Sequence, residues 1–206
     1  MRMQLHHAQF ALTQQEVRRL IEAAPTPRER TLLEVLYWYG LRREEARSLR
    51  IEDIDWTHGL IRIRGKSGKV RIVPTLNPEV LKHLRALANG ASEGPVFTGP
   101  SGRPLARRTI NFLVAKCARL AGISVPNPAR KHVHPHLLRH SLARHLKDAG
   151  FSLEFIKNLL GHASVATTVD LYGPMSLQDM LREALRLRHR VVQGIRGVPQ
   201  RKRARN

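Results

Sequence analysis

The chain has 206 residues, enough for one sizeable domain or at most two small ones. Its 36 lysines and arginines against 16 aspartates and glutamates give a formal net charge of +20, which favours nucleic acid as a partner over a plain ribosomal-type role or attraction to a membrane surface. The single cysteine excludes an internal disulfide, and no apolar run approaches the roughly 18 residues of a membrane span. Since the first residues also lack an apolar signal core, we expect a cytoplasmic protein that does not enter the membrane.

Three helices are predicted first. Thr13 and Glu16 have the spacing of a capping box, which opens a helix that two prolines then end. A second helix is expected from about 28 to 39, with Gly40 as its C-terminal stop, and a short third helix from 43 to 49.

The period of the apolar residues changes to two after this point. Residues 60–64 and 70–73 alternate as strands do, with 65–68 as the turn between them and 56–59 as the preceding turn. This pattern predicts a three-stranded antiparallel meander.

Most of the remaining chain has apolar residues at three-to-four spacing, which predicts helices over 78–89, 107–121, 135–149 and 152–160. The expected fold is therefore mainly α with a small three-stranded antiparallel β-sheet. We expect an N-terminal extension (1–12), one catalytic domain (13–190) and a basic tail (191–206).

A pair of polar residues at the start of the helix over 135–149 is the first candidate for chemistry. Pro135 favours a helix start, and His136 and Arg139 then project from one face, apart from the leucines that pack inward. Arginine suits phosphate because its fork binds two oxygens and stays charged. Arg42 is a second candidate, although for either arginine taken alone an ordinary surface residue is the favoured interpretation, because the chain has so many arginines.

Three further residues complete the set. Lys66 lies at the predicted hairpin tip, where lysine is common in turns but where a mobile ammonium could also give a proton to a leaving oxygen. His162 follows Gly161, either as a helix-end residue or as a hydrogen-bond donor to phosphate. Tyr172 either packs in the core or is a nucleophile, which would need cationic neighbours at neutral pH.

A zinc site competes for the histidines. His132, His134, His136 and His140 cluster, but Leu137 stands where a metalloprotease has its glutamate, and no cysteine or acidic ligand lies close by in sequence. We therefore expect no metal site.

Four stretches make the chain resemble the tyrosine recombinases, the phage integrase family. They are 39–49 (YGLRREEARSL), 64–74 (RGKSGKVRIVP), 135–146 (PHLLRHSLARHL) and 159–172 (LLGHASVATTVDLY). The resemblance runs from about residue 12 to 176. It implies a site-specific DNA recombinase or integrase that cleaves and rejoins double-stranded DNA through a covalent 3′-phosphotyrosine.

The resemblance also assigns roles to the six candidates. Tyr172 would attack the phosphorus, Lys66 would protonate the released 5′-hydroxyl, and His136 would assist proton transfer. The scissile phosphate would be held by Arg42, Arg139 and His162. Because transesterification keeps the bond energy in the protein linkage, neither ATP nor a metal is required, and we expect no cofactor.

The hairpin supplies further expected contacts to DNA phosphates, namely Arg62, Arg64, Lys69 and Arg71. Family members usually carry a separate DNA-binding domain upstream, so this chain is either a naturally short member or lacks that region. We expect a homo-oligomer on DNA, for which the helix after Tyr172 is a candidate contact, with packing on its own domain as the alternative.

Two rival functions stay open. A type IB topoisomerase uses the same nucleophile chemistry to nick and reseal one strand. A catalytically inactive architectural or regulatory DNA-binding protein is the rival from another class, and the full set of six residues argues against it.

Overall fold

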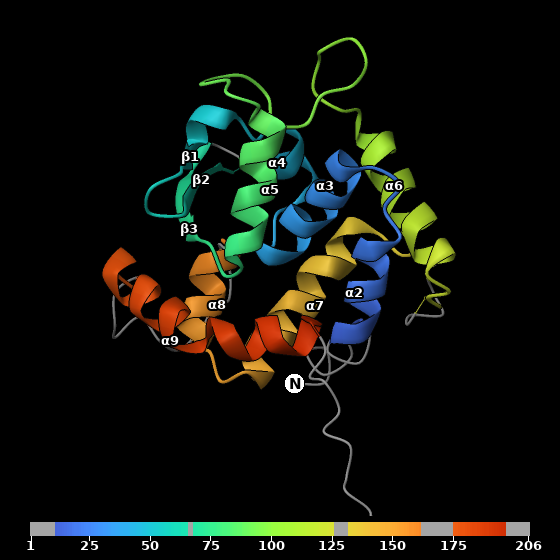
Figure 1. Ribbon diagram of the computed structural model, residues 1–206. Helices are drawn as coiled ribbons and strands as arrows, with labels where there is room; N and C mark the ends of the chain where they lie inside the picture. The colour runs from blue at the N-terminus through green and yellow to red at the C-terminus, as the bar shows by residue number, and fades with distance from the viewer. Residues whose placement is uncertain (1–10, 66–67, 126–131, 162–174, 197–206) are drawn as a thin grey trace, which may run out of the picture.

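The computed structural model describes residues 11–65, 68–125, 132–161 and 175–196 (Figure 1). Helices enclose the core, and a small sheet lies at one side of the molecule, as expected from the sequence. The helices are α2 (Gln14–Glu22), α3 (Pro27–Trp38), α4 (Arg43–Arg47), α5 (Pro78–Ala88), α6 (Arg107–Leu120), α7 (Pro135–Asp148), α8 (Leu153–Leu160) and α9 (Leu177–Arg196). A 3₁₀ turn (Ile51–Asp53) leads into strands β1 (Ile54–Asp55), β2 (Leu60–Arg64) and β3 (Val70–Pro74).

Helix α2 begins with the predicted capping box. The Thr13 hydroxyl accepts a hydrogen bond from the Glu16 amide at 3.2 Å, and the Glu16 carboxylate accepts one from the Thr13 amide at 2.7 Å. The two side chains satisfy amides that have no partner within the helix.

Helix α3 is the central helix of the fold, because every residue from Thr31 to Trp38 is buried. It packs against α5 and α7. Gly40 follows it with φ +58°, and a Cβ at this position would collide with the Leu160 side chain. The end of α3 therefore lies directly against the end of α8, and this contact brings together two of the stretches that carry candidate residues.

The sheet has the order β1-β2-β3, and its strands pair in antiparallel fashion. Along β2, Ile61 and Ile63 are buried while Arg62 and Arg64 are exposed. The register pairs Ile63 with Arg71, so the alternation of the two strands turns Arg71 toward the interior. The predicted meander is confirmed.

Helix α9 runs along the lower edge of the molecule in Figure 1 and packs on its own domain, against α2 and β3. Leu177 and Leu185 of this helix remain exposed. The helix continues to Arg196, into the range 191–206 where we expected a tail. Its buried face consists of Met180, Ala184, Leu187, Val191 and Ile195.

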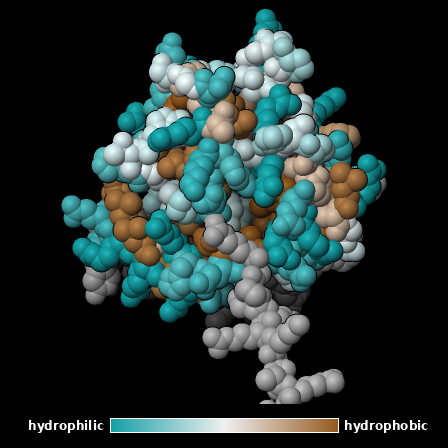
Figure 2. Space-filling model, viewed as in Figure 1, coloured by the Kyte–Doolittle hydropathy of each residue, from teal (hydrophilic) through white to brown (hydrophobic). Residues whose placement is uncertain are grey.

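The face of the molecule in Figure 2 is largely hydrophilic, with separate hydrophobic patches. None of the helices in the described ranges combines the length and the apolar character that crossing a bilayer requires.

Candidate active site

Arg139 is a buried cation at the junction of α3, α7 and α8. Only 2% of the residue is exposed, and its guanidinium donates hydrogen bonds to the Gly40 carbonyl at 2.6 Å and to the Leu160 carbonyl. Burial, followed by repulsion from Arg42, lowers the pKa of Arg139 to about 9. The two carbonyls offset part of the cost of burying this charge, and an anion would offset more.

Arg42 lies just before α4 and reaches the same place from the surface. Its Nη1 donates to the Glu45 carboxylate at 2.9 Å, and its Nη2 donates to the Gly161 carbonyl at 3.1 Å. Its side chain is 45% exposed, so the guanidinium is open to a ligand from solvent.

Glu45 is a buried carboxylate between two arginines. Each of its oxygens accepts a hydrogen bond from Arg71, at 2.8 and 2.9 Å, and the Arg42 amide donates to it at 2.8 Å. Burial of the carboxyl raises its pKa, but the hydrogen bonds and charge of Arg71 and Arg42 outweigh burial and lower the pKa of Glu45 to about 2. Glu45 is therefore a carboxylate at neutral pH.

Arg71 is placed differently from the other hairpin cations. We expected it to contact DNA phosphate, but it faces inward, where 14% of its side chain is exposed and Glu45 holds two of its nitrogens. Its Nε donates to the Leu159 carbonyl at 3.0 Å. This placement favours an internal role for Arg71 over the expected phosphate contact.

The other three expected DNA contacts lie at the surface. Arg62, Arg64 and Lys69 are exposed, and Arg64 also donates to Asp53 at 2.9 Å. Arg62 pairs with Ile72 across the outer face of the sheet, so a basic residue stands beside an exposed apolar one.

His136 stands on the first turn of α7, one turn before Arg139. Its ring lies edge-on to His140, with centroids 4.3 Å apart, and is stacked with His134 at 6.4 Å. Burial of the imidazole, with repulsion from His140 and Arg139, lowers the pKa of His136 to about 4, although part of the side chain remains open to solvent. His136 is therefore neutral in the free protein at neutral pH.

The remaining three candidates, Lys66, His162 and Tyr172, lie outside the described residues. The structure brings Arg42, Arg139 and His136 together. Gly161, which caps the C-terminal end of α8, is the residue before His162.

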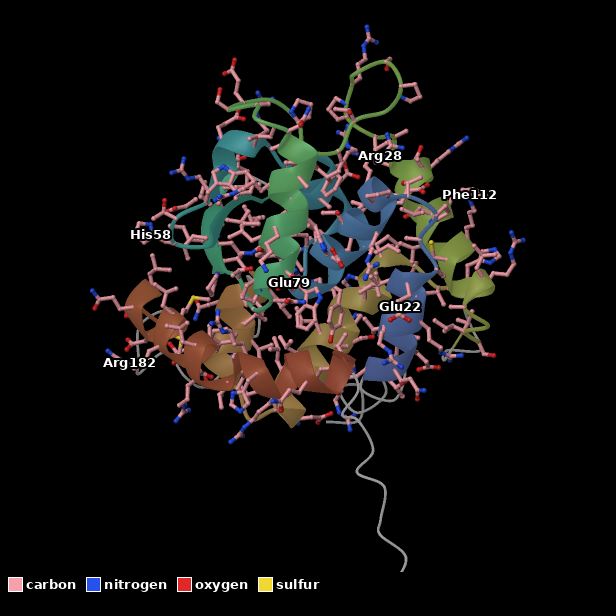
Figure 3. All side chains as sticks on the ribbon, in the orientation of Figure 1. Glu22, Arg28, His58, Glu79, Phe112 and Arg182 are labelled. Carbon is pink, nitrogen blue, oxygen red and sulfur yellow. The ribbon has the colours of Figure 1, made fainter. Side chains whose placement is uncertain are left out.

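The described ranges contain a small cavity and no cluster of metal ligands. Within those ranges, no group of three or more histidines, cysteines, aspartates or glutamates could hold a metal ion. A small cavity of about 60 Å³ lies between α3 and α6, lined in part by Arg28 and Phe112, which Figure 3 labels on these neighbouring helices. Its lining includes none of the candidate site residues.

Sequence reasoning missed Glu45 and the internal role of Arg71. A signal for Glu45 was present, since it follows Arg42 by three residues, the spacing of a capping box, and its carboxylate does accept from the Arg42 amide. Its second partner comes from a strand 26 positions later, and that pairing has no local signal.

Comparison with known proteins gives a consistent match. Residues 11–176 match the model of the phage integrase family. A tyrosine recombinase XerC of Xylella fastidiosa (strain M23) is 38% identical over 154 residues, which are 73% of this chain and 50% of that protein. A XerC of Xanthomonas campestris pv. campestris (strain B100) is 35% identical over 158 residues, 75% of this chain and 47% of that protein. The chain thus spans about half the length of these relatives.

Solved structures show the same fold. The XerA recombinase matches with a TM-score of 0.66 and 31% identity, covering 85% of this chain and 62% of that one. The catalytic core of the λ integrase matches with a TM-score of 0.61 and 20% identity, covering 77% of this chain and 95% of that one.

Proposed function

The chain belongs to the phage integrase family, and on this premise we propose that it is a site-specific recombinase that cleaves and rejoins DNA through a tyrosine. The proposed products of cleavage are a 3′-phosphotyrosine linkage and a free 5′-hydroxyl. We assign the six catalytic roles to Arg42, Lys66, His136, Arg139, His162 and Tyr172.

One observation carries the proposal. Two guanidiniums from distant parts of the chain, Arg42 and Arg139, reach successive carbonyls at the end of α8, Gly161 and Leu160. They converge directly before the stretch that contains His162 and Tyr172. Convergence of two such cations at one point suits a phosphate, because both can donate to oxygens that carry the charge of a five-coordinate phosphorus.

The proposed reaction exchanges one ester for another. The Tyr172 oxygen forms a bond to phosphorus while the bond from phosphorus to the 5′-oxygen breaks, and Lys66 supplies the proton that this oxygen needs. His136, which is neutral in the free protein, is suited to accept the proton that the Tyr172 phenol gives up and to return it when the DNA is rejoined. The 5′-hydroxyl of another strand then attacks the phosphotyrosine in the reverse sense.

Double-stranded DNA is the proposed partner, with Arg62, Arg64 and Lys69 as phosphate contacts on the exposed face of the hairpin. A relative of 26% identity, the XerH recombinase, has been solved bound to its difH substrate. The net charge of +20 supports the same partner.

We further propose that several copies act together on DNA. The λ integrase, which has the same fold, has been solved as a tetramer on a Holliday junction. In this chain the exposed Leu177 and Leu185 of α9 are the candidates for contact with a neighbouring copy.

The test is covalent capture on a nicked suicide substrate taken from the native locus. Wild-type protein should yield a protein–DNA adduct that survives denaturant, whereas Tyr172→Phe should reduce the adduct by more than about 100-fold, because it has no nucleophile. DNA affinity should change by less than about tenfold, since the variant loses only the hydrogen bonding of one hydroxyl, worth about 0.5–1.5 kcal/mol.

Equal adduct yield from Tyr172→Phe would reject Tyr172 as the nucleophile, and DNA binding with no adduct from wild type would favour a catalytically inactive DNA-binding protein. Relaxation of supercoils without exchange between two sites would favour a topoisomerase.

A further inference from the structure

Three arginines donate hydrogen bonds to carbonyls at the C-terminal end of helix α8. The Gly161 amide donates to the Lys157 and Asn158 carbonyls, at 2.8 and 3.2 Å. Within the described ranges, the next three carbonyls accept from arginines in three separate parts of the chain: Leu159 from Arg71, Leu160 from Arg139 and Gly161 from Arg42.

Such an arrangement has a clear electrostatic basis. The last carbonyls of a helix have no partner within the helix, and the helix dipole makes this end partially negative. Two of the three arginines, Arg42 and Arg139, already have a proposed role on phosphate. Arg71 is the third, and it is too deeply placed to reach DNA readily, with 14% of its side chain exposed.

Arg71 links two parts of the candidate site. Its Nη1 and Nη2 hold both oxygens of Glu45, which in turn holds the Arg42 guanidinium, while its Nε holds the Leu159 carbonyl. It also packs closely on Gly161, where a Cβ would lie 2.9 Å from the Arg71 Cδ.

We propose that Arg71 is a positioning residue for cleavage. Through Glu45 it holds the Arg42 guanidinium at the C-terminal end of α8, directly before the stretch that contains His162 and Tyr172. This inference rests on the proposed function. Without Arg71, Glu45 would be a buried carboxylate with a single cationic partner, so it would draw Arg42 away from the phosphate. The Leu159 carbonyl would lose its donor at the same time.

If Arg71 positions the site, its loss should slow the rate of cleavage without weakening DNA binding to the same extent. A misplacement of about 1 Å costs on the order of 100-fold in rate. We therefore expect Arg71→Ala to slow single-turnover adduct formation by about 100-fold while DNA affinity changes by less than about threefold. Arg71→Lys should recover little, because an ammonium cannot make the three directed hydrogen bonds of the guanidinium.

A double variant tests the route through Glu45. Adding Glu45→Gln to Arg71→Ala removes the charge that captures Arg42, so the double variant should cleave about tenfold faster than Arg71→Ala alone. Arg144→Ala is the matched control, since it removes an arginine paired with Asp148 on the surface of α7, at 2.9 Å, and should cleave as wild type does.

A modified substrate separates positioning from proton donation. When sulfur replaces the 5′-bridging oxygen, the leaving group needs no proton, because a thiol is a far stronger acid than an alcohol. This substrate should restore cleavage by Lys66→Ala and should leave the defect of Arg71→Ala unchanged.

Three results would overturn the proposal: wild-type cleavage by Arg71→Ala, restoration of its cleavage by the sulfur substrate, or a loss of affinity as large as the loss of rate. If Arg71→Ala fails to fold, as its thermal unfolding would show, Arg71→Lys takes its place in the same comparisons. Absence of adduct from wild-type protein on both substrates would instead reject the proposed function itself.

Discussion

Arg139 is a buried charge whose desolvation is unfavourable and whose guanidinium can bind a phosphate at this site. Burying a guanidinium is unfavourable unless its donors find acceptors, and here two backbone carbonyls accept from it. Burial lowers the pKa of Arg139, and repulsion from the exposed Arg42 beside it lowers this pKa further. A phosphate placed between the two would relieve this repulsion.

The lowered pKa of His136 predicts a pH dependence of stability. Because the folded-state pKa is about 4, against an ordinary value of 6.5, the unfolded chain takes up a proton below pH 6.5 that the folded protein takes up only near pH 4. The His136 imidazole therefore has no effect on the free energy of unfolding above pH 7. As the pH falls from 6.5 toward 4, it lowers the free energy of unfolding.

We expect His136→Asn to remove that contribution. The melting temperature of the variant minus that of wild type should be about 2 °C higher at pH 4.5 than at pH 7. We expect a difference of only this size because part of the ring is exposed to solvent, which screens its charge. Calorimetry of both proteins across this range is the measurement. A difference that stays constant with pH would contradict the lowered pKa.

At the scale of elements, the contact between the ends of α3 and α8 positions the site. Gly40 has φ +58°, and it leaves room for the Leu160 side chain, so the carbonyls of both residues come within reach of Arg139. Both requirements, a left-handed backbone and the absence of a Cβ, are met by glycine alone.

Gly40→Ala should therefore be costly. Left-handed strain of roughly 1–2 kcal/mol and overpacking of roughly 1–3 kcal/mol add to a loss of about 2–5 kcal/mol in the free energy of unfolding. Denaturant titration measures this loss.

Gly122→Ala is the matched control, because Gly122 has φ +62° and open space around its Cα. It should show the strain alone, about 1–2 kcal/mol. Equal losses for the two variants would mean that the close approach of Leu160 to Gly40 adds nothing to the cost of the substitution.

At the scale of the whole molecule, the excess of positive charge should dominate the affinity for DNA. A protein that neutralises 6–10 phosphates loses about 10³–10⁵ in affinity between 50 and 200 mM salt, through counterion release. The net charge of +20 is ample for contacts of this number.

Arg62→Gln should reduce the slope of log affinity against log salt by about 0.9, the amount expected for one phosphate contact. Arg62 is suited to the test because it is exposed on the outer face of the sheet. Fluorescence anisotropy at several salt concentrations gives both slopes, with Arg144→Gln as a control that should leave the slope unchanged. An unchanged slope for Arg62→Gln would remove this residue from the contact surface.

Local patterns were enough to predict most of the architecture. The capping box at Thr13, the stop at Gly40 and the alternation of β2 depend on neighbours a few residues away, so the order of helices and strands was correct before any tertiary information. The motifs around Arg42 and Arg139 likewise indicated the family that the comparisons confirm.

Only the tertiary structure decided how these pieces meet. The register of β2 and β3 turned Arg71 inward, and the contact of Gly40, just after α3, with Leu160 at the end of α8 set Arg42, Glu45 and Arg139 around one helix end. These contacts join residues far apart in the chain, and a hydrogen bond or ion pair of that kind depends on which distant surfaces become neighbours. The sequence pattern shows the spacing of apolar residues in each helix or strand, but it does not show which distant helix or strand packs against them.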